Sequence, residues 1–370
     1  MMRGNGSGLI VLSIAMAGLF GSAVRIEAQT SKSASSKAAS QTASTATSQP
    51  YDWKAAFAKV PTGKVPRMPD GKPNLQGIWS FSVLTPLERP HAQGKTEISS
   101  AEAEEIEDAA QKNAIALRVE STVTPPGEKT TDAYNSYWRD GFWYKVPMTV
   151  LHTSQVVDPP DGLVPPLTKA AEQRRDDVTM RLNRPAHGPE DRPTTSRCIR
   201  SLTSGPPFIG AGPGSQETTL EIVQSPQTVV VRESMDSQII PLDGRPRPPE
   251  SIELDKGVAR GHWDGDTLVV ESTNFAPWAS GFFSAYGTTD KMHLTERWKR
   301  LDDLHMLYGF TIDDPGTWTK PWSVEFVMWR MADQEELVEY ACHAGNVGIE
   351  FTLSAARTKE RQDASENDNQ

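Results

Sequence analysis

Residues 262–275 read H-W-D-G-D-T-L-V-V-E-S-T-N-F, and this stretch decides the fold class. It contains the pair Asp264–Gly265, which is a strong signal for a two-residue hairpin turn because such turns need positive φ angles. The runs on both sides of the pair are rich in β-branched and aromatic residues, as strands usually are. The stretch therefore predicts a tight antiparallel hairpin in the second half of the chain.

Short strands at similar spacing continue on both sides of this hairpin. Nine segments have strand character, namely 219–225, 228–234, 238–242, 258–263, 267–275, 293–301, 306–312, 323–331 and 337–343. Short joins between them predict an antiparallel meander, and closing it into a barrel removes the exposed edges. We therefore expect a mainly β protein with a lipocalin-like barrel over residues 219–356, wide enough to hold one small ligand. A two-sheet sandwich is the alternative.

The preceding residues, 51–218, have a different character and are expected to form a helix- and loop-rich segment that packs on the barrel. Prolines interrupt its first part, which leaves room for only a short strand around residues 77–83. A helix is predicted over 97–117, because Ser99 and Glu102 form a capping box at its start.

A second helix of this segment is predicted from Thr168 to about Leu182. It is followed by a long loop at 184–218 that contains several prolines and glycines. Loops of this length inside a compact domain are often lids or binding loops.

The two ends of the chain are expected to lie outside the folded part. Residues 1–28 have the layout of a secretory signal peptide, with Arg3 before an apolar run and small residues at a cleavage site. Residues 29–50 are polar and predict a disordered linker, and residues 357–370 predict a disordered tail. The expected location is therefore the periplasm or the exterior of the cell, with no membrane contact once the signal is removed.

Composition and motifs exclude several classes of protein. The net charge is −10 without a basic stripe, so nucleic acid is not an expected partner. The chain has no G-x-S-x-G, no P-loop and no H-E-x-x-H motif. The seven histidines show no pair at metal-ligand spacing. We therefore expect no metal and no cofactor, and a partner that is a small molecule.

The two cysteines predict a disulfide. In an exported protein, an even number of cysteines is most often paired, so Cys198 is expected to be bonded to Cys342. His343 follows Cys342 directly and suggests a thiol–imidazole catalytic pair as the alternative. Neighbouring residues of a regular strand point to opposite faces, so this pair could not act on one substrate atom.

Polar residues at the expected strand ends are the candidates for a site. A histidine at a barrel mouth can act as general acid or base, since its pKa lies near neutrality. An arginine there can bind a ligand carboxylate or form an ion pair with a glutamate. Structural roles for the same residues are the alternative. The candidate catalytic residues are His293, His343 and Glu271, and the candidate ligand-binding residues are Arg297, Trp298, Asn346 and Trp263.

Many short motifs occur in an order that resembles a large family of uncharacterised exported bacterial proteins. Among them are P-D-G-K-P-N-L-Q-G-I-W, V-D-P-P-D-G, W-D-G-D-T-L-V-V-E-S-T-N-F, H-L-T-E-R-W and C-H-A-G-N, and together they cover about residues 65–355. Relatives usually carry an acidic residue where this chain has Ala344. The resemblance implies export and a shared fold, and it names no reaction.

Two functions are compatible with these observations. The first is an exported barrel protein that binds an aromatic, glycosidic or apolar small molecule, with hydrolysis or elimination by acid–base chemistry as its possible reaction. The second is a non-catalytic envelope or interaction module, in which the ten tryptophans serve packing and partner contact.

Overall fold

The structure is a computed structural model, and it describes most of the chain from residue 51 onward. The described residues are 51–90, 94–122, 146, 148, 151–201, 203–212, 215, 217–276, 288–331, 337, 339 and 341–367. The predicted signal peptide and linker, residues 1–50, lie outside this part. Within it, no helix is both long and apolar enough to cross a membrane.

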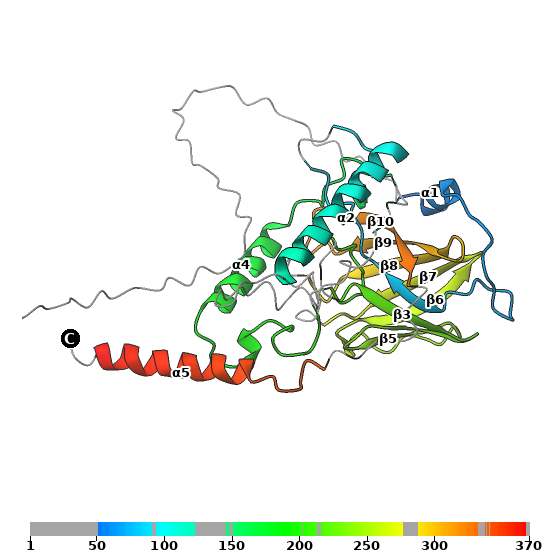
Figure 1. The fold of residues 1–370 in the computed structure, drawn as a ribbon. Helices are drawn as coiled ribbons and strands as arrows, with labels where there is room; N and C mark the ends of the chain where they lie inside the picture. Colours follow the sequence, from blue (N-terminus) through cyan, green and yellow to red (C-terminus); the bar gives the residue numbers. More distant parts are fainter. Residues whose placement is uncertain are drawn as a thin grey trace, which may run out of the picture. The chain divides into compact units, whose positions relative to one another are not determined.

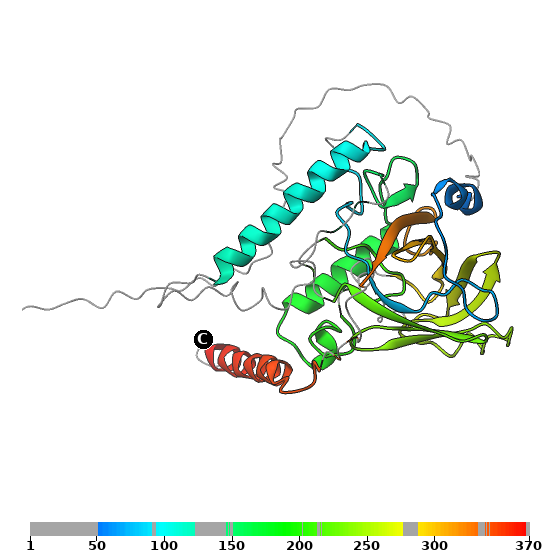
Figure 2. The same ribbon diagram turned by 45° about the vertical axis from the view of Figure 1, so that its right-hand side comes forward.

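The dominant element is one antiparallel sheet that curls into a nearly closed barrel (Figures 1 and 2). Nine strands follow one another around it in the order β5-β4-β3-β1-β10-β9-β8-β7-β6, and β2 (Val156–Asp158) pairs with β10 beside this path. The bounds of the nine, in chain order, are β1 Gly77–Ser80, β3 Thr219–Gln224, β4 Thr228–Arg232, β5 Ser237–Pro241, β6 Val258–Asp264, β7 Thr267–Thr273, β8 His293–Arg300, β9 His305–Asp313 and β10 Trp322–Arg330. The predicted barrel class is confirmed.

The hairpin predicted from residues 262–275 is present and is formed by β6 and β7. Asp264 pairs with Thr267, so the two loop residues are Gly265 and Asp266, one position later than the Asp-Gly pair suggests. Gly265 has a φ of 59°, which glycine adopts without steric cost. Asp266 also forms a bidentate ion pair with Arg67 of the N-terminal segment.

Eight of the nine predicted strand segments are strands, and the ninth is wrong. Of residues 337–343, the described ones are outside any strand, and 342–345 form a turn. Strand β1 from the N-terminal segment takes a place in the sheet instead, between β3 and β10. The barrel is therefore completed by a strand that is distant in sequence.

The barrel seam lies between β5 and β6. The segment joining them contains Pro246, Pro248 and Pro249, which cannot donate backbone hydrogen bonds. Side chains hold the seam instead: Gln238 Nε2 lies 3.4 Å from both Ser272 Oγ and the carbonyl oxygen of Lys256. The barrel is thus nearly closed, without a continuous ladder at this point.

A large apolar core fills the barrel. In β8, β9 and β10, alternate residues belong to this core, which is the expected period for strands. The largest inward side chains include Trp79, Trp298, Tyr308, Phe310, Trp322 and Phe326.

The helices lie outside the sheet (Figure 2). Helix α2 (Ser100–Thr122) begins with the predicted capping box: Ser99 N–H donates to Glu102 Oε2 over 2.8 Å, and Glu102 N–H donates to Ser99 Oγ over 3.2 Å. Helix α4 (Lys169–Asn183) begins after Thr168, whose hydroxyl accepts from the Ala171 N–H. Both predicted helices are confirmed.

The C-terminal segment differs from the prediction of a disordered tail from residue 357. Helix α5 spans Gly348–Asn367 and includes most of that segment. Ion pairs one turn apart support it, with Arg357 and Glu360 at 2.6 Å and Lys359 and Asp363 at 3.3 Å. Arg357 also ties the helix to the carbonyl oxygen of Ala186.

Helix α1 (Trp53–Lys59) packs on the outer face of β8–β10. Its Trp53 donates a hydrogen bond to Thr311 Oγ1 over 2.9 Å, and its ring lies where a side chain at Gly309 would be. Phe57 joins Trp53 in a small core with Leu307 and others. The close approach of Trp53 to the sheet therefore depends on the glycine at position 309.

We expect Gly309→Ala to lower the free energy of unfolding by about 1–3 kcal/mol, because the added methyl group must displace the Trp53 ring. Gly212→Ala is the control, since a methyl group there meets nothing within 4 Å. Urea denaturation of both variants measures the effect. Equal stability of the two variants would show that Trp53 does not pack on Gly309 as described.

Candidate functional site

A carboxylic acid lies inside the barrel among aromatic side chains. Strand β8 reads H-L-T-E-R-W-K-R, and its inward residues are Leu294, Glu296, Trp298 and Arg300. Glu296 is therefore the one acidic residue on the inward face of β8. Its exposure to solvent is 0%. Buried acids of this kind need hydrogen-bond partners or a neutral charge state.

Tyr308 of β9 provides one partner for this acid. Its hydroxyl donates to Glu296 Oε1 over 2.8 Å and accepts from the Phe208 N–H over 3.0 Å. Burial raises the pKa of Glu296 to about 8, against the smaller lowering effects of Tyr308 and Lys256. Glu296 is therefore a neutral acid at pH 7.

The proton of this acid has a defined position. Oε1 accepts the hydrogen bond from Tyr308, so the hydrogen of the neutral acid resides on Oε2. Among the described residues, Oε2 of Glu296 and the indole Nε1 of Trp298 have no hydrogen-bond partner. Two donors thus lie two residues apart on one face of one strand, unpaired and fully buried. Buried polar groups usually have hydrogen-bond partners, so the absence of partners for these two donors requires an explanation.

Aromatic rings surround the two donors. The Trp298 and Tyr308 rings are 4.5 Å apart between centroids and meet at 63°. Phe208 contacts both of them, with centroid distances of 5.8 and 5.9 Å, and Phe326 lies 5.3 Å from Tyr308. The side chains packed around Glu296 are therefore mainly aromatic, and their polar atoms are the Tyr308 hydroxyl and the Trp298 indole nitrogen.

Phe208 belongs to the predicted long loop, and a buried ionic cluster holds that loop in place. The Gly205 N–H donates to Glu233 Oε1 over 2.9 Å, and Arg200 donates to the carbonyl oxygens of Ser204 and Gly205. Lys256 forms ion pairs with Glu233 and Asp236. Burial raises the pKa of Glu233, and the Lys256 ammonium opposes this effect.

The predicted site residues fall into three places. Trp298 and Trp263 belong to the inner face, where Trp263 packs against the main core and faces Lys72 at 5.7 Å. His293, Glu271 and Arg297 lie on the outer face. Among the described residues, no hydrogen bond or ion pair joins His293 to His343 or to Glu271.

The outer residues have other partners. Glu271 is half exposed and lies 3.5 Å from Arg247, so the predicted pairing with Arg297 is replaced by this pair. Arg297 lies over the Trp53 ring at 4.9 Å, and burial lowers the pKa of its guanidinium to about 10. His293 pairs across the ladder with Asp313.

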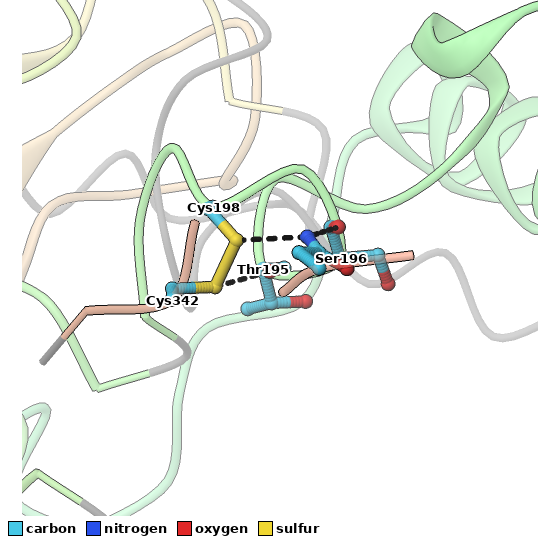
Figure 3. Close-up of a disulfide and its surroundings, with 5 residues drawn as sticks. Thr195, Ser196, Cys198 and Cys342 are labelled. Carbon is cyan, nitrogen blue, oxygen red and sulfur yellow. Dashed lines mark hydrogen bonds between the residues drawn. A yellow bond between two sulfur atoms is a disulfide. The ribbon is translucent and has the colours of Figure 1, made fainter. Parts of the chain in front are cut away.

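The remaining two predicted residues lie at the disulfide. Cys198 and Cys342 are bonded, which confirms that prediction, and their Cα atoms are 5.5 Å apart. Asn346 Nδ2 donates to Cys198 Sγ over 2.9 Å and to the Ser196 carbonyl oxygen over 3.2 Å (Figure 3). His343 is exposed in the adjacent turn. Asn346 thus has a structural contact in this loop.

Glu296 and Tyr308 were missed as site residues, although the sequence holds a signal for the first. Alternation places Glu296 on the same face as Leu294 and Trp298, opposite His293 and Arg297. An acid within an apolar strand face is the signal. Tyr308 follows only from the register of β8 with β9, in which it lies opposite Trp298.

The described residues contain no group of three or more His, Cys, Asp or Glu side chains that could hold a metal ion. Comparison with protein-family models, with curated proteins and with solved structures finds no match for this chain.

Proposed function

We propose that this protein is an exported barrel protein that binds a small aromatic molecule inside the barrel, next to Glu296 and Trp298. The observation that carries the proposal is the pair of unpaired, fully buried donors on β8. A ligand oxygen that accepts from both donors would satisfy them, and the surrounding rings would pack against its apolar part. The disulfide supports an oxidising location.

The chemistry of the two donors defines the ligand class. The neutral Glu296 Oε2–H and the Trp298 Nε1–H both donate, so they select an acceptor: a carbonyl, ether or glycosidic oxygen. A ligand carboxylate is disfavoured, because a charged group would lose its hydration among the aromatic rings without a cationic partner at the two donors. An aromatic ketone, a phenolic ether or an aryl glycoside meets these requirements.

Entry of the ligand depends on Phe208 in this proposal. The Phe208 ring contacts the rings of both Trp298 and Tyr308, so a ligand must displace it. Within the described part of the chain, one hydrogen bond joins this residue to the site, from the Phe208 N–H to the Tyr308 hydroxyl. The loop on which Phe208 lies is held at Gly205 by Glu233, which would let the ring move while the loop base stays in place.

The same acid supports a reaction. Glu296 can transfer its proton from Oε2 to the bound ligand oxygen, and the resulting carboxylate would keep the hydrogen bond from Tyr308. Protonation of a glycosidic or ether oxygen assists its departure in hydrolysis or elimination. A neutral acid at pH 7 is what this step requires, so hydrolase or lyase activity is the catalytic form of the proposal.

A thermal-shift screen of aromatic ketones, phenolic ethers and aryl glycosides tests the proposal. A ligand that raises the melting temperature of the wild type should have little effect on Trp298→Phe, which keeps the ring stacking and removes the donor. Glu221→Gln is the control, since Glu221 pairs with Arg232 on the outer face of β3. Any hit is then incubated with the protein and analysed for cleavage products.

Two outcomes would contradict the proposal. If every hit stabilised Trp298→Phe as strongly as the wild type, the interior donors would not be the site. If instead His343→Ala alone abolished the shift, the ligand would bind at the disulfide turn, as the sequence first suggested.

A further inference from the structure

Another buried acid lies on the outer face of the barrel. On β10, Val324 and Phe326 point into the core, so Glu325 between them points outward. Its exposure is only 3%, and residues 152–155 lie beside it, with His152 near its carboxyl group and the Gln155 carbonyl oxygen accepting from its N–H. Its Oε2 has no hydrogen-bond partner among the described residues. This acid has no part in the interior site.

His152 lies between the Glu325 carboxyl group and the solvent. Its Nε2 lies 3.8 Å from Glu325 Oε1, and one third of its side chain is exposed. This distance lies within ion-pair range and is too long for a hydrogen bond, so no hydrogen bond joins these two described side chains.

Two aromatic rings complete the surroundings. Tyr51 and Trp53 meet edge to face, with centroids 4.8 Å apart. Burial and then the carboxyl groups of Glu325, Asp158 and Asp52 raise the pKa of the Tyr51 hydroxyl, which shows that these acids act on the same point. The outer place therefore combines aromatic rings with several acids.

Charged groups of both signs face this place. Glu97 acts on His152, as does Arg89, and Lys320 acts on Asp158. Arg89 is already held by Thr153 and by the carbonyl oxygens of Pro160 and Asp161. The acids are Glu325, Asp158, Asp52 and Glu97, and the bases are Arg89, Lys320, His152 and, over the Trp53 ring, Arg297.

We propose that this outer place, formed by Glu325, His152, Tyr51 and Trp53, binds a small organic cation with a primary ammonium group. The ammonium donates to the unpaired Oε2 of Glu325, and its alkyl part packs on the Tyr51 ring. Ammonium groups bind well beside carboxylates and aromatic rings, because both present negative potential. A free alkylamine and a lysine side chain share this chemistry.

The proposal has a definite pH dependence. Burial raises the pKa of Glu325 to about 7, so binding of a cation must ionise part of the population and release its proton. Affinity therefore rises with pH through about 7. His152 acts in the same direction, since its imidazolium competes with the ligand for Glu325 at low pH, and burial lowers its pKa.

Isothermal titration of the full chain with n-butylammonium tests this inference, with n-butanol as the uncharged control. The heat is measured at pH 7 in two buffers of different ionisation enthalpy, which gives the number of protons released. We expect binding of the cation only, with proton release. Glu325→Gln should bind about 10- to 100-fold more weakly, as expected for the loss of a charge-assisted hydrogen bond. Glu221→Gln should bind like the wild type.

Three results would overturn the inference: no binding of n-butylammonium by the wild type, equal affinity in Glu325→Gln, or binding without proton release. If Glu325→Gln does not fold, as judged by circular dichroism, the number of protons that the wild type releases on binding n-butylammonium tests the inference by itself. Lysine amide as a second probe then distinguishes a side-chain ligand from a free alkylamine by its relative affinity.

Discussion

Replacing Glu296 with glutamine should make the protein more stable at pH 8 and leave its stability nearly unchanged at pH 5. The pKa of Glu296 is raised from 4.5 to about 8 in the folded protein. An acid with a raised pKa stabilises the fold fully below its unfolded value, and this stabilisation is lost as pH rises through about 8. Glutamine resembles the neutral acid in shape and hydrogen bonding, and it cannot ionise.

The expected size of this effect follows from the shift. Each pKa unit corresponds to about 1.4 kcal/mol. The difference in free energy of unfolding between wild type and Glu296→Gln should therefore change by an amount on the order of 4 kcal/mol between pH 4.5 and 8. Urea denaturation at intervals of pH measures it. Glu233 and Glu325 also have raised pKa values, and their contributions cancel because both proteins contain them. Parallel stability curves for wild type and Glu296→Gln would show that the acid ionises normally.

Removing the disulfide should lower the free energy of unfolding by about 3–5 kcal/mol in the chain-entropy model, because the bond closes a long loop in the unfolded chain. Cys198 and Cys342 are 144 residues apart in sequence. The bond also fixes the start of the segment that leads to Arg200 and Phe208. The double variant Cys198→Ser/Cys342→Ser is therefore expected to lose stability and to hold the Phe208 loop less firmly.

Reductant provides the control for this prediction. It should lower the urea midpoint of the wild type to that of the double variant and should leave the variant unchanged. Intact mass should show the oxidised wild type two hydrogens lighter than its reduced form, a difference that follows from the chemistry of the bond. Alkylation of both cysteines without reductant would contradict the pairing.

Local signals in the sequence account for most of the barrel. The β6–β7 hairpin and the alternation in β8 depend on neighbouring residues, so their patterns are visible in a single chain. Strand β1 could not be placed in this way, because its position between β3 and β10 depends on contacts across more than a hundred residues of sequence. The segment 337–343 has strand-like alternation, yet a disulfide and a glycine turn hold its end instead.

The sequence is sufficient to predict that Glu296 is buried, but it does not predict that Tyr308 and Phe208 lie beside it. The sequence places Glu296 opposite His293 and beside Trp298, so an acid on an apolar face could have been noticed. Histidines at the expected strand ends favour His293 and His343 as site residues, although alternation directs His293 outward. Tyr308 and Phe208 reach Glu296 through strand register and loop packing, which no short pattern in the sequence encodes.

Glu296 is a neutral acid inside the barrel, with its Oε2–H unpaired among the described residues. The carbon-13 signal of the glutamate side-chain carboxyl reports this directly, when the signal missing from Glu296→Gln is followed against pH in the wild type. We expect a midpoint near 8, and a higher midpoint with a bound ligand, because a hydrogen bond from the neutral acid disfavours ionisation. A midpoint near the ordinary value for glutamate, about 4.3, would contradict it.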